Sequence, residues 1–127
     1  MQNSLPIRFN YEFSRVYKRG RFIPGRFIVV HCFKRPSHLR HNNVRIPTGM
    51  NRVGFSVSRK VKGAVQRNRC RRLLKESYRL LEGEITLGYD IVFMLKQVDP
   101  IPEFSQIQDE MRRILRRLDL SQNGGQK

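Results

Sequence analysis

The sequence predicts a single α+β domain in which helices lie beside a small sheet in two layers. The chain has 127 residues, about the length of one domain. Its hydrophobic fraction of 39% is far above that of a disordered chain. Its hydrophobic period changes along the chain in the order helix, two or three strands, helix, strand, helix, without an internal repeat. We expect the domain to span residues 1–120, followed by a disordered tail over 121–127.

The first expected element is a short helix. Asn10 can cap its start, and Phe13, Val16 and Tyr17 follow the i, i+3, i+4 spacing of one helical face. Gly20 is expected to end this helix.

Two segments then have the composition of strands. Residues 27–33 are rich in β-branched and aromatic side chains and predict a central strand, paired with a short piece near 21–23. Residues 52–58 alternate, so one face is expected to pack on a core while the other can meet a ligand. Between them, residues 34–51 are polar and basic and predict a mobile loop.

Residues 62–81 predict a long helix, because they contain no proline and no glycine after Gly63. At about 100° per residue one face is basic and centred on Asn68, and the opposite face suits a core. The basic face holds Arg71, Arg72, Lys75 and Arg79; the core face holds Gln66, Cys70, Leu73, Ser77 and Leu81, flanked by Leu74 and Leu80. Residues 89–95 predict a further strand, and 102–120 predict a last helix with Pro102 in its first turn.

The charge of the chain requires a polyanionic partner. Lys plus Arg is 26 and Asp plus Glu is 10, a net charge of +16, which favours nucleic acid or an anionic membrane surface. No segment approaches the roughly 18 to 20 apolar residues of a membrane span, and residues 1–10 lack the apolar core of a signal peptide. We therefore expect a cytoplasmic protein. Cys32 and Cys70 have no CxxC spacing and are expected to be buried hydrophobic residues.

The densest functional signal is the basic run around Asn68. Arginines at helical intervals present planar guanidinium groups suited to gripping successive phosphates. The simpler interpretation is a solvated amphipathic helix, in which charges usually alternate in sign. Here Glu76 is the only acid between Arg67 and Leu81, which favours nucleic-acid binding.

No catalytic apparatus is visible in the chain. A protein nuclease needs clustered carboxylates for metals, or a pair of groups for acid–base work. His38 and His41 lie in the polar loop without a nearby acid. The carboxylates at 82, 84 and 90 surround a turn and are expected to be solubilising. We expect neither catalytic residues nor a metal site.

The run Arg67-Asn68-Arg69, followed by Arg71-Arg72-Leu73, comes after a strand that reads RVGFSVS from Arg52. Together with Phe13, Tyr17 and Gly20, these residues resemble the protein subunit of bacterial ribonuclease P over about residues 11–120. Three features depart from the family pattern: residues 34–51 are longer than its usual connection, Cys70 stands where a branched apolar residue is usual, and Arg71 and Lys75 exchange basic types.

The resemblance implies an αβββαβα order with a left-handed βαβ crossover, like the second domain of ribosomal protein S5. It also implies that a partner RNA carries the chemistry. That RNA, folded around Mg²⁺, removes the 5′ leader of precursor tRNA, while the protein grips the RNA and the leader and needs no obligate protein partner.

The expected site residues fall in two groups. Those assigned to RNA binding are Arg52, Lys60, Arg67, Asn68, Arg69, Arg71, Arg72 and Lys75. Helical spacing alone favours a core role for Phe13 and Tyr17, whereas the resemblance implies that they line a leader cleft, with His31 and Ser56 as weaker candidates for its floor. Asn68 is a candidate to orient a metal-bound water.

Two other classes of function stay open from the sequence. A structural RNA-binding protein, such as a ribosomal protein, would need the basic helix but no leader cleft. A DNA-binding module is disfavoured, because zinc-finger and basic-zipper patterns are missing. The preferred precursors, the oligomeric state of the holoenzyme and the role of residues 34–51 are not specified by the sequence.

Overall fold

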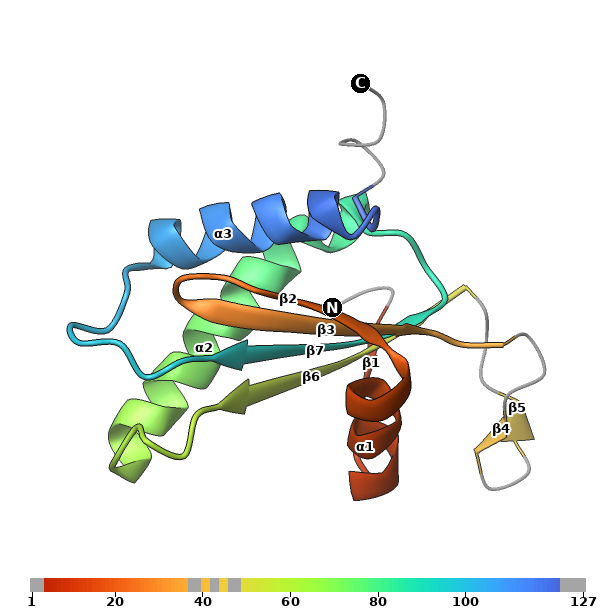
Figure 1. The fold of residues 1–127 in the computed structure, drawn as a ribbon, viewed down its shortest axis with the longest axis horizontal. Coiled ribbons are helices and arrows are strands. Elements are labelled where there is room, and N and C mark those ends of the chain that lie inside the picture. Colours follow the sequence, from red (N-terminus) through yellow and green to blue (C-terminus); the bar gives the residue numbers. More distant parts are fainter. Residues whose placement is uncertain (1–3, 37–39, 42–43, 46–48, 122–127) are drawn as a thin grey trace.

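The computed structural model describes residues 4–36, 40–41, 44–45 and 49–121 of the chain (Figure 1). The helices are α1 (Asn10–Arg19), α2 (Ala64–Leu81) and α3 (Phe104–Arg117), with a 3₁₀ turn, η1 (Glu82–Glu84), after α2. The strands are β1 (Ser4–Pro6), β2 (Arg21–Pro24), β3 (Ile28–Lys34), β4 (Arg40–His41), β5 (Val44–Arg45), β6 (Asn51–Val57) and β7 (Tyr89–Leu95). Apart from β1 and the small β4–β5 pair, this is the predicted αβββαβα order.

Five strands form one mixed sheet in the order β1-β6-β7-β3-β2. Strands β2, β3 and β7 pair antiparallel, whereas β1, β6 and β7 pair parallel. Strands β6 and β7 are joined through α2, which passes behind the sheet in the view of Figure 1. Both arrows point to the left and β7 lies above β6, so this crossover is left-handed, as the resemblance implied (Figure 1).

The main core lies between the sheet and the two helices α2 and α3. Phe93 of β7 and Tyr78 of α2 are fully buried, with ring centroids 5.4 Å apart, and Phe55 of β6 stacks on Phe93. Cys32 and Cys70 also lie in this core as free thiols, and burial raises the pKa of both, which confirms them as buried hydrophobic residues.

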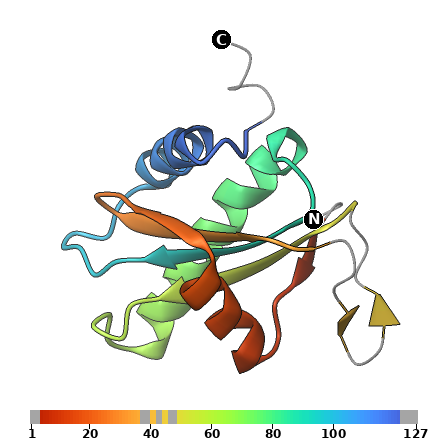
Figure 2. The same cartoon turned by 45° about the vertical axis from the view of Figure 1, so that its right-hand side comes forward.

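The opposite face of the sheet is only partly covered by the described residues, of whose helices α1 alone lies on it (Figure 2). Val16 of α1 and Val92 of β7 are fully buried beneath the helix. Gly54 of β6 permits this close packing: a Cβ there would lie 2.6 Å from Cε1 of Phe13. The remainder of this face is left open.

Several element boundaries differ from the sequence prediction. The N-cap of α1 is Phe9, not Asn10, because the carboxylate of Glu12 accepts hydrogen bonds from the backbone N–H groups of Arg8 and Phe9. Helix α3 begins at Phe104, two residues after Pro102. Strand β3 is an interior strand paired with β2, as predicted, whereas Leu80 is exposed although it was placed beside the core face.

The two predicted irregular regions are partly built into the fold. Ser121 is buried and bridges to Ile85, so it belongs to the domain; the rest of the predicted tail, residues 122–127, lies outside the described residues. In the predicted loop 34–51, Arg35 is buried and residues 40–41 and 44–45 form a small hairpin. Its residues 37–39, 42–43 and 46–48 lie outside the described part of the chain. The expectation that His38 has no nearby acid therefore concerns a residue that the structure does not describe.

Candidate nucleic-acid interface

Helix α2 presents its predicted basic face to solvent. Cys70, Leu74 and Tyr78 hold the helix on the core by its other face. The exposed polar residues on or beside the outer face are Lys60, Asn68, Arg69, Arg72 and Lys75, and Arg71 is half-buried among them. The cations carry single positive charges at helical intervals, a pattern that suits a phosphate chain.

Asn68 and Arg71 form a small polar unit on this face. Nη1 of Arg71 donates to Oδ1 of Asn68 at 3.3 Å. The bond uses the carbonyl of the amide and leaves the –NH₂ of Asn68 as a donor at the centre of the basic face. Arg79 is different, because Glu76 neutralises it in an exposed ion pair of 2.8 Å.

Arg67, which the sequence assigned to RNA binding, is half-buried and bonded to the backbone, unlike the exposed cations around Asn68. Its guanidinium donates to the carbonyls of Ser58 at 2.8 Å, Val61 at 3.2 Å and Val57 at 3.2 Å. The side chain therefore ties the first turn of α2 to the end of β6. These bonds position the basic face relative to the sheet.

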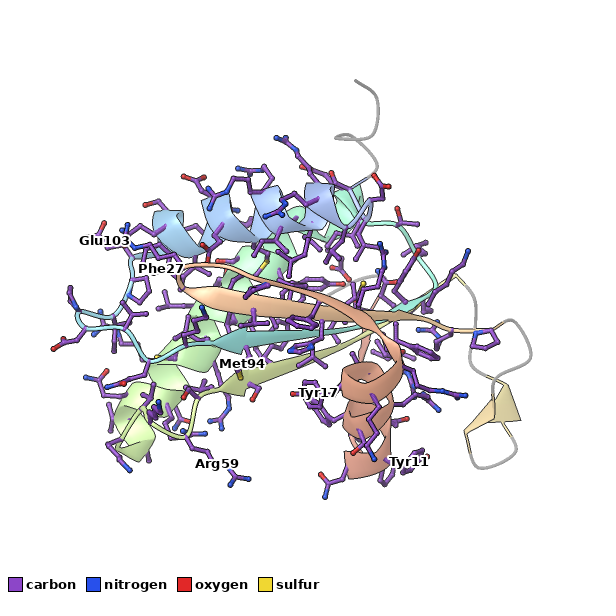
Figure 3. All side chains as sticks on the ribbon, viewed as in Figure 1. Tyr11, Tyr17, Phe27, Arg59, Met94 and Glu103 are labelled. Carbon is purple, nitrogen blue, oxygen red and sulfur yellow. The ribbon has the colours of Figure 1, made fainter. Side chains whose placement is uncertain are left out.

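Gly63 makes the turn into α2 possible. It is the N-cap residue and has φ of 86°, in the left-handed region that favours glycine. Beside this turn, the exposed residues Arg59 and Lys62 extend the cationic surface beyond Lys60 (Figure 3).

Arg52, which the sequence also assigned to RNA binding, is a buried residue with 5% exposure and does not lie on the outer surface of the fold. Its Nε and Nη2 donate to the two carboxylate oxygens of Asp90 at 3.0 and 2.8 Å, and its Nη1 pairs with Glu12 of α1. Burial lowers the pKa of Arg52, but the bonds to Asp90 and the charge of Glu12 outweigh burial and raise the pKa above its ordinary value. A phosphate cannot reach this guanidinium without opening the fold.

Asp90 is the centre of a larger ion-pair cluster, not a solubilising carboxylate. It is fully buried and also pairs with Arg35 at 3.0 Å and with Arg15 of α1 at 3.4 Å. Glu82, another predicted surface acid, is buried and accepts a hydrogen bond of 2.6 Å from Ser4 of β1. We call Glu12, Arg15, Arg35, Arg52 and Asp90 the buried ion cluster.

Three rings gather on the open face of the sheet, at the edge of α1. Tyr17 meets His31 of β3 edge to face, with ring centroids 4.7 Å apart. Phe22 of β2 pairs with His31 across the strands and stacks on it at 5.4 Å and 25°. Tyr17 and Phe22 are 43% and 59% exposed, which is unusual for rings that touch one another. We call Tyr17, Phe22 and His31 the aromatic platform.

The platform continues along the sheet as a shallow row of smaller side chains. Met94 of β7 pairs in register with Val29 of β3 and with Ser56 of β6. Val29 is two residues from His31 along β3 and so lies on the same face of the sheet. Figure 3 shows Tyr17 projecting from α1 beside the strands, with Met94 farther along the same sheet. Phe13 is partly buried on Gly54 and packs with the small core under α1, so it supports the platform more than it extends it.

Burial shifts the pKa of the two titratable rings of the platform. It lowers the pKa of His31 below 6.5 and raises the pKa of Tyr17 above 10.0. Both side chains are therefore neutral at pH 7 and present uncharged aromatic surface beside the cations of the chain. The sequence assigned Tyr17 and His31 to this site but missed Phe22, whose short strand carries no alternation signal, and Met94, which lies in a continuous apolar run.

Comparison with known proteins gives one consistent result. The family model described as ribonuclease P matches residues 1–119. The chain belongs to the ribonuclease P protein family. The ribonuclease P protein component of Thermoanaerobacter sp. (strain X514) is 38% identical over 114 residues, which cover 90% of this chain and 89% of the relative. That of Clostridium novyi (strain NT) is 37% identical over 120 residues, covering 94% and 98% of the two chains.

Solved structures of the family share this fold. The Staphylococcus aureus RNase P protein superposes with a TM-score of 0.72 at 28% identity, covering 91% of this chain and 96% of that one. The RNase P protein of Thermotoga maritima, at 23% identity, has a TM-score of 0.68 over 88% of this chain and 96% of that one, and shows likeness of fold alone. The predicted α+β architecture is thus confirmed.

Among the described residues, no group of three or more His, Cys, Asp or Glu side chains could hold a metal ion. The same part of the chain contains no helix that is both long enough and apolar enough to cross a bilayer. The candidate site therefore consists of two surfaces, the basic face of α2 and the aromatic platform, on opposite sides of the sheet.

Proposed function

We propose that this protein component of ribonuclease P works by binding two RNAs at once. The basic face of α2 binds the catalytic RNA of the holoenzyme, and the aromatic platform binds the single-stranded 5′ leader of precursor tRNA. The RNA cleaves the leader with bound Mg²⁺ and releases the mature tRNA 5′ end in the cytoplasm. The observation that carries this proposal is the exposed platform, because a purely structural RNA-binding protein needs the basic helix alone.

The basic face suits a folded RNA. Arg69, Arg72 and Lys75 are exposed without a carboxylate ion-pair partner among the described residues. Each cation that contacts a phosphate releases condensed counterions, so binding strengthens steeply as salt falls. Nearby, the –NH₂ of Asn68 adds a neutral donor for a phosphate oxygen or a metal-bound water.

The platform suits an unpaired strand. Bases stack on aromatic rings at about 1 to 3 kcal/mol each with little dependence on sequence. Tyr17 and Phe22 present exposed rings on either side of His31, and Met94 and Ser56 continue the same face. The neutral state of His31 lets its ring stack without the cost of desolvating a charge.

The residues of this chain do not fit a protein-held Mg²⁺ site. Mg²⁺ prefers carboxylate, phosphate and water oxygens, whereas α2 presents cations and one amide. We therefore assign the metal to the RNA, whose strands the basic face draws together.

A reconstitution tests the proposal. The chain is added to a bacterial ribonuclease P RNA at low Mg²⁺, and the rate of 5′ processing of a precursor tRNA is measured. We expect acceleration by the wild-type chain and by an Arg113→Ala/Arg116→Ala control on α3, but a large loss with Arg72→Ala/Lys75→Ala. No acceleration by the wild type at any Mg²⁺ concentration would exclude the proposal.

The leader assignment has its own test. Tyr17→Ala and Phe22→Ala should each weaken holoenzyme binding of a precursor by about 5- to 150-fold, from the loss of one stacked base. Binding of mature tRNA, which has no leader, should be unchanged. An equal loss for precursor and mature tRNA would remove the platform from the leader site.

A further inference from the structure

We propose that a cationic pocket at the edge of the sheet binds a phosphate group of the leader strand after the strand leaves the aromatic platform. This inference rests on the proposed function. It adds a third RNA contact, separate from the basic face of α2 and from the stacking rings.

The pocket lies where β2 begins and β3 is left without an edge partner. Strand β2 pairs with β3 from Pro24 only as far as Arg21, opposite Cys32. Beyond that point, no described strand covers the outer edge of β3, and a pocket of about 320 Å³ occupies the gap. This volume lies at the lower end of the range for small-ligand sites. The lining residues are Arg19, Gly20, Arg21, Cys32, Phe33, Lys34 and Tyr89.

The lining is cationic on three sides. Arg19 ends α1, Arg21 begins β2 and Lys34 ends β3, and no carboxylate is among the lining residues. A cation at the last turn of a helix is expected from the helix dipole, which accounts for Arg19. The dipole does not account for Arg21 or Lys34, which come from two strands and converge on the same space.

Arg21 is held in place for this role. Its Nη2 donates to the carbonyl of Leu118 at 2.9 Å and approaches Sγ of Cys32 at 4.0 Å. A guanidinium has five N–H donors, so this anchoring leaves most of them for a ligand. A fixed planar donor with two flexible cations beside it matches the charge and geometry of a phosphodiester.

Gly20 sets the shape of the pocket. The chain passes so close to β3 here that a Cβ on Gly20 would lie 2.1 Å from the carbonyl oxygen of Cys32. This close approach brings Arg19 and Arg21, on either side of the glycine, to the same opening. Phe33 and Tyr89 supply aromatic surface beside the cations, which suits the sugar and base attached to a phosphate.

The position of the pocket selects the ligand. The Phe22–His31 pair of the platform and the Arg21–Cys32 pair of the pocket are consecutive rungs between β2 and β3. Side chains of consecutive rungs point to opposite faces, so Arg21 reaches the pocket from the α3 side, where it bonds to Leu118, whereas Phe33 of the pocket shares a face of β3 with His31. His31 and Phe33 are two residues apart, about 7 Å at 3.3 Å per strand residue, so one short stretch of single-stranded RNA can pass from the platform to the pocket at the open edge of β3. A phosphate in this pocket is therefore explained by the leader itself.

The experiment compares charge removal in the pocket with equal removal elsewhere. Arg19→Ala/Lys34→Ala holoenzyme is compared with Arg113→Ala/Arg116→Ala holoenzyme, all four positions being exposed. Binding is measured for precursors with leaders from one nucleotide upward, over a salt series. We expect the pocket variant to lose about five- to tenfold in affinity for long leaders and nothing for the shortest, with a salt dependence reduced by about one unit.

The outcomes separate this proposal from the function on which it rests. If Tyr17→Ala weakens leader binding while the pocket variant equals its control at every length, the pocket proposal fails and the proposed function stands. Lys34→Glu provides a second variant, and it should lower long-leader affinity further than Lys34→Ala. Circular dichroism of each variant checks that the chain is folded.

A free anion is the other source of the same chemistry. Inorganic phosphate is titrated into the ¹⁵N-labelled wild-type chain, and the amide resonances of Gly20 and Tyr89 are followed. Perturbation of these resonances, lost in Arg19→Ala/Lys34→Ala, together with a leader-length effect supports the RNA assignment. Perturbation without a leader-length effect would make the pocket a free-phosphate site and overturn the RNA assignment.

Discussion

The arginines of α2 and the arginines beneath α1 have the same chemistry and opposite positions. Arg69 and Arg72 extend into solvent, whereas Arg35 and Arg52 are buried around Asp90. The acid partner makes the difference, because a buried guanidinium needs a carboxylate, and an unpartnered one must stay in water. A basic sequence therefore contains two populations of cations, one that holds the fold and one that remains for the RNA.

The largest expected effect comes from removing the acid of the buried ion cluster. Asp90→Asn removes the carboxylate that Arg52 and Arg35 share, leaving two buried cations around Glu12, and we expect a loss of about 3 to 5 kcal/mol in the free energy of unfolding. Urea denaturation followed by circular dichroism measures it. The control is Glu76→Gln, whose ion pair with Arg79 is exposed, and it should not change the urea midpoint. Equal urea midpoints for Asp90→Asn and Glu76→Gln would show that the buried arginines do not depend on their carboxylate more than the exposed arginines do.

A buried carboxylate can also act without a buried arginine. Glu110 of α3 accepts hydrogen bonds from three successive backbone N–H groups of the β2–β3 connection, Arg26, Phe27 and Ile28, at 2.7 to 2.8 Å. Glu110→Gln removes the charge that strengthens these bonds, and we expect a loss of about 2 kcal/mol in stability. The exposed Asp109→Asn variant should unfold like the wild type in the same assay. A Glu110→Gln chain with wild-type stability would show that the charge is not needed.

The sharpest test of the comparison uses two arginines of one helix. Arg67→Ala removes three bonds to backbone carbonyls and should cost about 1 to 2 kcal/mol of stability, while the salt dependence of RNA binding stays unchanged. Arg72→Ala should leave stability unchanged and reduce the salt slope of RNA binding by about one unit. Urea unfolding curves measure the stability of both variants, and RNA binding over a series of salt concentrations measures the salt slope. The reverse pattern would exchange the roles we give to the two residues.

The smallest expected effect concerns the titratable ring of the platform. Burial lowers the pKa of His31 below 6.5, so in mildly acidic solution the unfolded chain binds more protons at this site than the folded chain does. His31 therefore lowers the stability as the pH falls below 6.5. His31→Phe keeps the ring and removes the proton, so the difference between urea midpoints at pH 7 and pH 5.5 should shrink. An unchanged difference would mean that the ring titrates equally in both states.

The sequence predicted the main helices and strands and the exposed cations of α2. Periodicity identified α1, α2, β7 and α3, because each buries one continuous face or run. It missed β1, whose three residues are too few to show alternation and whose pairing with β6 is set by distant residues. The predicted basic face of α2 is exposed at Asn68, Arg72, Lys75 and Arg79, because solvent exposure follows directly from the helical angle.

The errors at the site share one physical cause. Arg52 alternates outward on β6, as predicted, but α1 covers that position and supplies Glu12 as a partner from 40 residues away. Arg67 was assigned to RNA binding, but the end of β6 and the loop before α2 offer carbonyls that occupy its guanidinium. Such pairings depend on tertiary contacts, which local spacing does not contain, and the same is true of the juxtaposition of Phe22 with His31.

The bonds of Arg35 have a consequence for the stretch that departs most from the family pattern. Its guanidinium holds the carbonyl of Met50 at 2.5 Å and that of Tyr89 at 2.8 Å, so it fastens both ends of the excursion between residues 36 and 49 to the sheet. Because this clasp fixes the two anchor points, the excursion can be lengthened, shortened or exchanged during evolution at a small entropic cost. The family can thus vary this appendage without disturbing the helix and strands beside it.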